Sequence, residues 1–215
     1  MCAHTFGTHG LDGEMSITVG NRTINLRKSG EGYGYEREDR RVSLVDAESL
    51  EILPYPAIGY GVRFLMLRLR ADLVVPPGDS LTGYLSAPVD VSVRVGDVEI
   101  DRFTVCREKY ALYGKDNVGV ITRYWVTSFS RDEPEPLGAM KVVVRNPTER
   151  WGRLDRIVVP IANSPMFYSP DRAYYPLVIV TLREFPEVNN TGNPPDGTLK
   201  RAGEDRIIPN FLMRW

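Results

Sequence analysis

Residues 82–129 constrain the fold most, because apolar and polar residues alternate there at the period of a β-strand. Every second residue of Val89–Val95 is valine. The residues between these valines are polar: Asp90, Ser92 and Arg94. The pattern predicts a strand with one buried face and one face in water. Gly96 and Asp97 follow, which predicts a two-residue hairpin into a strand that starts at Val98.

The strand after this hairpin changes its alternation. Val98 and Ile100 share one parity, whereas Phe103 and Val105 have the other. A β-bulge at residues 101–102 would reconcile the two halves of the strand. Because bulges re-aim side chains, this position also indicates a site.

Alternating segments separated by Gly and Pro recur along the chain, and helical periodicity is almost absent. Residues 30–34 are predicted to be a loop, Pro54 and Pro56 are predicted to break regular structure, and residues 42–53 suit a strand or one helical turn. Further strands are predicted at 62–75, 81–86, 119–128, 139–146, 153–161 and 175–184, with a first hairpin at 16–25. We predict an all-β fold, an antiparallel β-sandwich or a jelly-roll-like fold, with few short helices.

A chain of 215 residues suits one large β domain or two small ones. We predict a flexible N-terminal segment at 1–14, a β-sandwich domain at 15–188, and a loop and C-terminal tail at 189–215. The tail regains apolar residues that would dock on the core: Ile207, Ile208, Phe211, Leu212 and Trp215. The Pro-rich stretch 131–136 suits a linker or a long hairpin connection.

Composition bounds the source and the compartment. Only five of the 27 basic residues are lysine and there is no glutamine, which favours a thermophilic source, although a GC-rich genome also favours arginine. Cys2 and Cys106 are the two cysteines, so we expect no structural disulfide and a cytoplasmic location. No segment approaches the roughly 18 apolar residues of a membrane helix, so no membrane span is expected.

Several stretches of the chain match one known pattern. They are residues 53–56, 64–67, 75–78, 88–93, 100–103, 109–114 and 123–125. With these stretches the chain resembles an archaeal family of uncharacterised proteins, catalogued as domain of unknown function 432. The resemblance covers most of residues 50–185 and implies an archaeal source. It implies no reaction, ligand or catalytic residue.

No catalytic signature stands out. The two histidines, His4 and His9, lie in the segment predicted to be flexible, whereas a nucleophile–histidine system needs a rigidly held base. Cys2, His4 and His9 have a spacing that resembles metal ligation, but a fourth ligand and a fixed scaffold are missing, so no metal site is predicted. Nucleotide-binding glycine motifs are also missing, and no cofactor is expected.

One group of cationic and aromatic residues is the candidate ligand or partner site. It consists of Arg102, Arg107, Lys109, Tyr110, Tyr113, Arg123, Tyr124 and Trp125. If strands 98–105 and 119–128 pair, these side chains gather at one end of a sheet, where they could hold phosphates, bases, sugars or carboxylates. Alternatively, Asp101, Glu108 and Asp116 neutralise the cations as structural ion pairs.

We therefore expect a non-catalytic binding or assembly module that uses this Arg/Tyr-rich loop and its strand edges. Its partner would be a second copy of the chain, another protein or a small anionic ligand. One alternative is an enzyme acting on a sugar or nucleotide, with Asp101, Glu108 and Asp116 as the nearest carboxylates. Another alternative is RNA or ribosome association, which the net charge of −1 disfavours but does not exclude.

Overall fold

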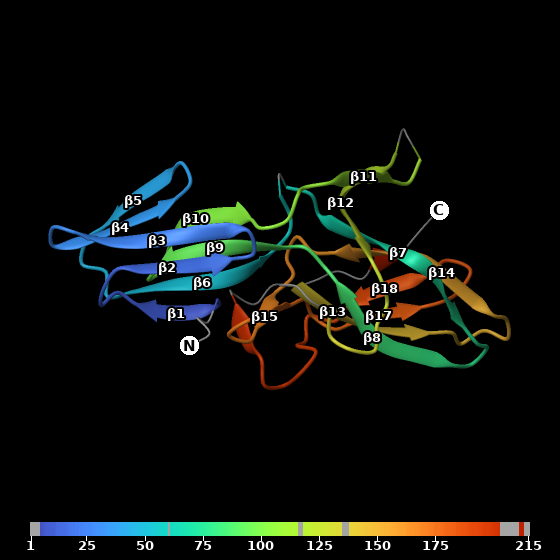
Figure 1. The fold of residues 1–215 in the computed structure, drawn as a ribbon. Helices are drawn as coiled ribbons and strands as arrows, with labels where there is room; N and C mark the ends of the chain where they lie inside the picture. Colours follow the sequence, from blue (N-terminus) through green and yellow to red (C-terminus); the bar gives the residue numbers. More distant parts are fainter. Residues whose placement is uncertain (1–4, 60, 116–117, 135–137, 203–210, 213–215) are drawn as a thin grey trace.

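The computed structural model describes residues 5–59, 61–115, 118–134, 138–202 and 211–212 (Figure 1). These residues form strands and turns and contain no helix, so the predicted all-β class is confirmed, and the few short helices that we expected are not found among them. No membrane-spanning helix occurs in this part of the chain.

Four sheets form two sandwich-like halves that lie side by side (Figure 1). The first sandwich contains sheet A, with the order β1-β6-β9-β10, and sheet B, with the order β2-β3-β4-β5. The strands of sheet A are β1 (Gly7–Gly10), β6 (Ser49–Pro56), β9 (Val89–Val95) and β10 (Val98–Thr104). The strands of sheet B are β2 (Met15–Val19), β3 (Arg22–Ser29), β4 (Gly32–Arg37) and β5 (Arg40–Leu44).

The second sandwich contains sheets C and D. Sheet C has the order β11-β12-β7-β14, with β11 (Tyr110–Tyr113), β12 (Val120–Thr127), β7 (Phe64–Val75) and β14 (Gly152–Pro160). Sheet D has the order β19-β15-β16-β13-β17-β18-β20, and β8 also pairs with β13. Its strands are β8 (Ser80–Ser86), β13 (Gly138–Arg145), β15 (Met166–Tyr168), β16 (Ala173–Tyr174), β17 (Val178–Thr181), β18 (Glu187–Asn190), β19 (Lys200–Ala202) and β20 (Phe211–Leu212).

One hydrophobic core runs through both sandwiches. Its members include Ile24 of sheet B and Val91 of sheet A in the first sandwich, and Leu67 of sheet C and Val142 of sheet D in the second. All four side chains are fully buried. Burying a side chain of this size stabilises the fold by about 1.5–3 kcal/mol, so the alternating apolar positions decide which face of each strand turns inward.

Local sequence signals predicted three features correctly. β9 and β10 form the predicted hairpin, in which Gly96 has a φ of 53°, a value that glycine adopts without strain. The register of this pair shifts between Glu99 and Asp101, which confirms the predicted bulge. The predicted first hairpin is also present as β2 and β3.

Several local predictions were wrong. Residues 32–34 belong to β4 rather than to a loop, and Pro54 and Pro56 lie inside β6. The prolines are tolerated because β1 pairs only with residues 49–52 of β6, so one side of the strand is open beyond that point. Gly7–Gly10 form β1, so part of the segment expected to be flexible is paired.

We predicted antiparallel sheets, but two of the four sheets also contain parallel pairs. β7 and β12 pair in parallel, and β13 pairs in parallel with both β16 and β17. A parallel pair needs a long crossover connection. For β7 and β12 this connection runs through sheet D and then sheet A before it returns.

As a result the chain crosses between the sandwiches three times, near residues 57–63, 87–88 and 105–109. We call the boundary where these crossings meet the seam. The hydroxyl of Tyr175, which is fully buried, donates to the carbonyl of Pro88 at 2.8 Å and accepts from the backbone N–H of Ala57 at 3.0 Å. Tyr175 therefore joins two of the three crossings.

Replacing Tyr175 with Phe removes both hydrogen bonds and leaves a buried N–H and a buried carbonyl without partners. We expect Tyr175→Phe to lower the free energy of unfolding by about 1–3 kcal/mol, measured by urea denaturation. Tyr33→Phe is the control, because Tyr33 is half-buried and makes no side-chain hydrogen bond to the described residues. Equal stability of the two variants would contradict the structural role of the Tyr175 hydroxyl.

Candidate functional site

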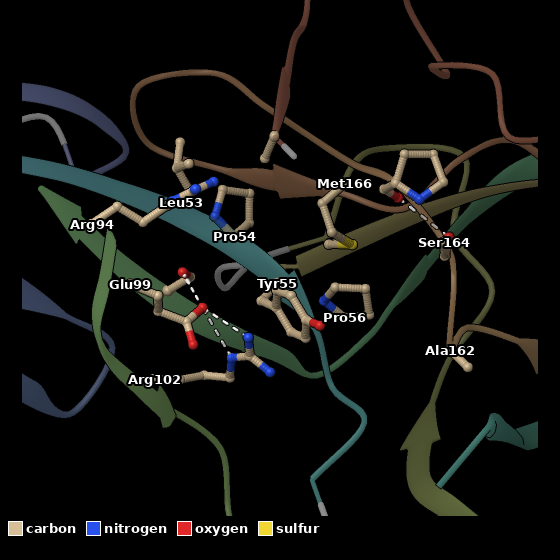
Figure 2. A pocket seen from close by; sticks show the side chains of 13 residues that line it. Leu53, Pro54, Tyr55, Pro56, Arg94, Glu99, Arg102, Ala162, Ser164 and Met166 are labelled. Carbon is tan, nitrogen blue, oxygen red and sulfur yellow. Dashed lines mark hydrogen bonds and ion pairs between the residues drawn. The ribbon is translucent and has the colours of Figure 1, made fainter. Parts of the chain in front are cut away.

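A pocket of about 290 Å³ lies at the seam. One wall is the outer face of sheet A, formed by β6, β9 and β10, and the other wall belongs to the second sandwich (Figure 2). That second wall consists of Ala162, Ser164, Pro165, Met166 and Ala202. The pocket, which we call the seam pocket, is therefore assembled from segments far apart in the sequence.

Strand alternation and the bulge place the polar residues of the first wall. Leu53, Ser92 and Arg102 are cross-strand neighbours in one row, because the register pairs Leu53 with Ser92 and Ser92 with Arg102. In the next row Arg94 is opposite Glu99. Glu99 and Arg102 are three residues apart, so in a regular strand they would point to opposite faces. The bulge brings both to the pocket.

Arg102 is held in a defined position in the pocket. Its guanidinium carbon lies 3.9 Å from the ring centroid of Tyr55, and its Nη2 donates to Glu99 Oε2 at 2.8 Å. The hydroxyl of Ser92 donates to the same carboxylate oxygen at 2.7 Å. Figure 2 shows Arg102 beside Tyr55, with Met166 and Ser164 across the pocket. A cation that is stacked and paired in this way is preorganised for a ligand.

Arg94 supplies a second guanidinium group. Its Nη2 donates to the carbonyl of Asp97 at 2.9 Å, whereas its Nε is buried and has no hydrogen-bond partner among the described residues. The first wall thus carries two guanidinium groups and one carboxylate, that of Glu99. This excess of positive charge suits an anionic oxygen, because guanidinium groups bind carboxylates and phosphates with charge-assisted hydrogen bonds.

Asp90 of β9 is the cross-strand neighbour of Tyr55 and is buried. Burial raises the pKa of Asp90 to about 6, and the opposing influences of Thr104 and Arg123 do not offset it. Asp90 and Ser92 were predicted to lie on a face in water. Both are buried, because the second sandwich covers that face of sheet A.

The predicted cationic and aromatic group is divided between two places. Arg102 lies in β10 at the seam pocket, whereas the rest of the group lies on or beside the hairpin of β11 and β12. The expected pairing of strands 98–105 and 119–128 was wrong, since β10 pairs with β9, and β12 pairs with β11 and β7. Arg102 therefore belongs to a different sheet from Arg123 and Tyr124.

Arg123 has a structural position. It is 1% exposed, its Nη1 lies 3.1 Å from Glu108 Oε1, and its Nη2 donates to the carbonyl of Cys106 at 3.3 Å. These contacts fix the third crossing of the chain at the seam. The sequence left open that Asp101, Glu108 and Asp116 pair with the cations of the group. Glu108 does so with Arg123, whereas Asp101 pairs with Arg37 of sheet B.

The remaining members of the group differ in exposure. Arg107 and Lys109 are exposed, Tyr113 is buried, and Tyr124 and Trp125 are half-buried. The indole Nε1 of Trp125 donates to Ser86 Oγ at 3.3 Å. Tyr110 donates its hydroxyl proton to Glu108 at 2.9 Å. Asp116 lies outside the described residues.

The described residues contain no group of three or more His, Cys, Asp or Glu side chains arranged to hold a metal ion. Cys2 and His4 lie outside the described residues, and His9 is part of β1, opposite Leu50. Burial raises the pKa of the Cys106 thiol, which disfavours a reactive thiolate.

Tyr55, Arg94 and Glu99 also line the pocket, although none of them belonged to the predicted group. A signal for Arg94 was present, because it belongs to the polar face of the 89–95 strand. No local pattern shows which segment covers that face, so neither the pocket nor its second wall could be predicted.

The burial of Arg123 predicts that Arg123→Ala destabilises the fold. Loss of one partner of a buried ion pair costs about 3 kcal/mol or more, so the urea midpoint should fall clearly. Arg107→Ala is the matched control, because exposed substitutions usually stay within about 0.5 kcal/mol. If the Arg123 variant were as stable as the control, the guanidinium would not be holding the crossing.

Asp90 predicts a pH-dependent stability. Its pKa in the folded protein, about 6, lies above the ordinary value of 3.8, so its contribution to stability is complete only below pH 3.8 and is lost as pH rises through 6. From pH 4 to 7 the wild type should lose roughly 2 kcal/mol more than Asp90→Asn, whose side chain stays neutral. Urea denaturation at several pH values measures this difference, and parallel stability curves would refute it.

Comparison with known proteins identifies a family and nothing further. No curated protein and no solved structure matches the chain significantly. One family model matches residues 5–213, which is nearly the whole chain, and its description is "Protein of unknown function (DUF432)". The resemblance noted in the sequence is thereby confirmed, and the chain belongs to this family of proteins.

Proposed function

We propose that the chain is a non-catalytic binding module whose seam pocket holds a small anionic ligand. The observation that carries the proposal is the pair of guanidinium groups in the pocket, with Arg102 stacked on Tyr55 and Arg94 Nε without a partner among the described residues. For the chain as a whole, a cytoplasmic location, an archaeal and thermophilic source and self-association remain predictions.

The size and lining of the pocket limit the ligand. A volume of about 290 Å³ lies at the lower end of the roughly 300–1,000 Å³ common for small-molecule sites. A carboxylate or phosphate group would bind Arg94 and Arg102. Glu99 neutralises one of these two positive charges, so the pocket keeps one net positive charge. An apolar portion of the ligand would contact Met166 and Leu53 on the two walls. A small metabolite with one anionic group fits these requirements.

A thermal-shift screen of small carboxylates and phosphate esters tests the proposal. A ligand at a hundredfold excess over its Kd should raise the melting midpoint by about 5–10 °C, because binding to the folded state alone stabilises it by mass action. Arg102→Gln and Arg94→Gln should each remove most of this shift. Arg41→Gln is the control, because Arg41 is an exposed arginine of β5 away from the pocket.

Two results would contradict the proposal. One is that no anionic compound raises the midpoint, and the other is that the shift survives in both pocket variants. The bound compound should also be recovered unchanged by mass spectrometry. Its conversion to a product would favour the enzyme alternative over a binding module.

A further inference from the structure

The hairpin of β11 and β12 has an open edge. In sheet C, β11 pairs with β12 and with no other strand of the described residues. The backbone N–H of Tyr124 donates to the carbonyl of Lys109 at 2.8 Å, so Lys109 and every second residue after it direct their backbone groups toward β12. The N–H and carbonyl groups of Tyr110 and Leu112 therefore point to the open side, where a further strand can pair.

Exposed apolar side chains gather on this same hairpin. Five of the ten large hydrophobic residues that are exposed in the described part of the chain lie between residues 110 and 121. They are Tyr110, Leu112, Val118, Val120 and Ile121. Beside them is an open hollow of about 640 Å³, lined by residues 61–64 together with Tyr110, Val120 and Ile121. Such a concentration of exposed apolar surface marks an interaction site.

The charges around the edge decide which partner fits. Arg107, Lys109 and Lys115 are exposed and form no ion pair with the described residues, whereas the nearby Glu108 is engaged by Arg123. The described residues of the edge therefore carry an excess of positive charge, although the whole chain has a net charge of −1. A second copy that paired here would bring the same cations against one another, which is unfavourable.

We propose that this edge binds an extended acidic segment of a partner protein, which adds an antiparallel strand to β11. The register of β11 covers Tyr110–Tyr113, so two apolar residues of the segment would lie opposite Leu112 and Tyr110. A carboxylate beyond each end of this pairing would approach Lys115 or Lys109, which flank the strand. Along the partner chain the order is a carboxylate, any two residues, an apolar residue, any residue, an apolar residue and a carboxylate. RNA fits less well, because four of the five exposed apolar residues are aliphatic and do not stack on bases.

The proposal is independent of the seam pocket, and a labelled peptide tests it with the full chain. The probe is fluorescein-labelled Glu-Ser-Thr-Val-Thr-Val-Glu, followed by fluorescence anisotropy, with the same peptide carrying Lys in place of both Glu as its counterpart. The acidic peptide should bind, more weakly as salt is raised, and the basic peptide should not. The double variant Lys109→Glu with Lys115→Glu should weaken binding about tenfold, because two attractive charge pairs become repulsive.

Two further variants separate strand pairing from simple charge attraction. Leu112→Pro removes an N–H on the open side and keeps the ladder to β12, so it should abolish binding. Ile121→Ser removes apolar contact without altering the backbone, and remains informative if the proline variant does not fold. Lys28→Glu and Val45→Ser are the matched controls, because both residues are exposed on the first sandwich. Both controls should bind the peptide as the wild type does.

Several outcomes would overturn the proposal. Failure of the acidic peptide to bind would do so, as would unchanged binding by the double lysine variant or by Ile121→Ser. Light scattering that finds a dimer, and a monomer after the Ile121→Ser change, would show that a second copy occupies the edge. Displacement of the peptide by single-stranded RNA, with tighter RNA binding that the lysine variant loses, would assign the edge to nucleic acid.

Discussion

The fold depends on buried polar contacts at the seam, because neither sandwich is a continuous stretch of chain. Tyr175 joins the first two crossings through Ala57 and Pro88, and Arg123 secures the third through Cys106 and Glu108. Both side chains are almost fully buried, so any displacement of a crossing leaves a polar group in the interior without its partner. The hydrophobic core that runs through both halves favours compactness without fixing directions, whereas these hydrogen bonds and the ion pair specify how the halves join.

The same junction shapes the candidate site. The second sandwich covers the polar face of sheet A, which buries Asp90 and Ser92, and the seam pocket remains where that cover is incomplete. Arg102 is held there by Glu99 and Tyr55, and Arg94 is held through its Nη2 by the carbonyl of Asp97. Because both guanidinium groups are already fixed by these neighbours, the entropic cost of binding the proposed ligand would be lower.

Local signals in the sequence predicted local structure, and they failed where distant segments meet. The alternation of Val89–Val95 and the change of parity after Ile100 predicted the hairpin and its bulge, because both follow from neighbouring residues. The parallel pairing of β7 with β12 has no such signal, since their connection passes through the other sandwich. Arg123 was assigned to the candidate site because it belongs to a dense group of cationic and aromatic residues that an expected pairing of strands 98–105 and 119–128 would gather. Its burial depends on Glu108 and on the crossing, which only the tertiary structure brings together.

The interleaving of the sandwiches has a consequence for synthesis on the ribosome. Sheet A cannot close until β10 has emerged, which at about 5–20 residues per second means a wait of roughly 5–20 seconds for 104 residues. β7 is made early, and its partner strands in sheet C end at Thr127 and Pro160. Until those strands have been made, Leu65, Leu67 and Leu69 lack the neighbours that bury them in the folded protein, and apolar surface exposed in this way favours aggregation.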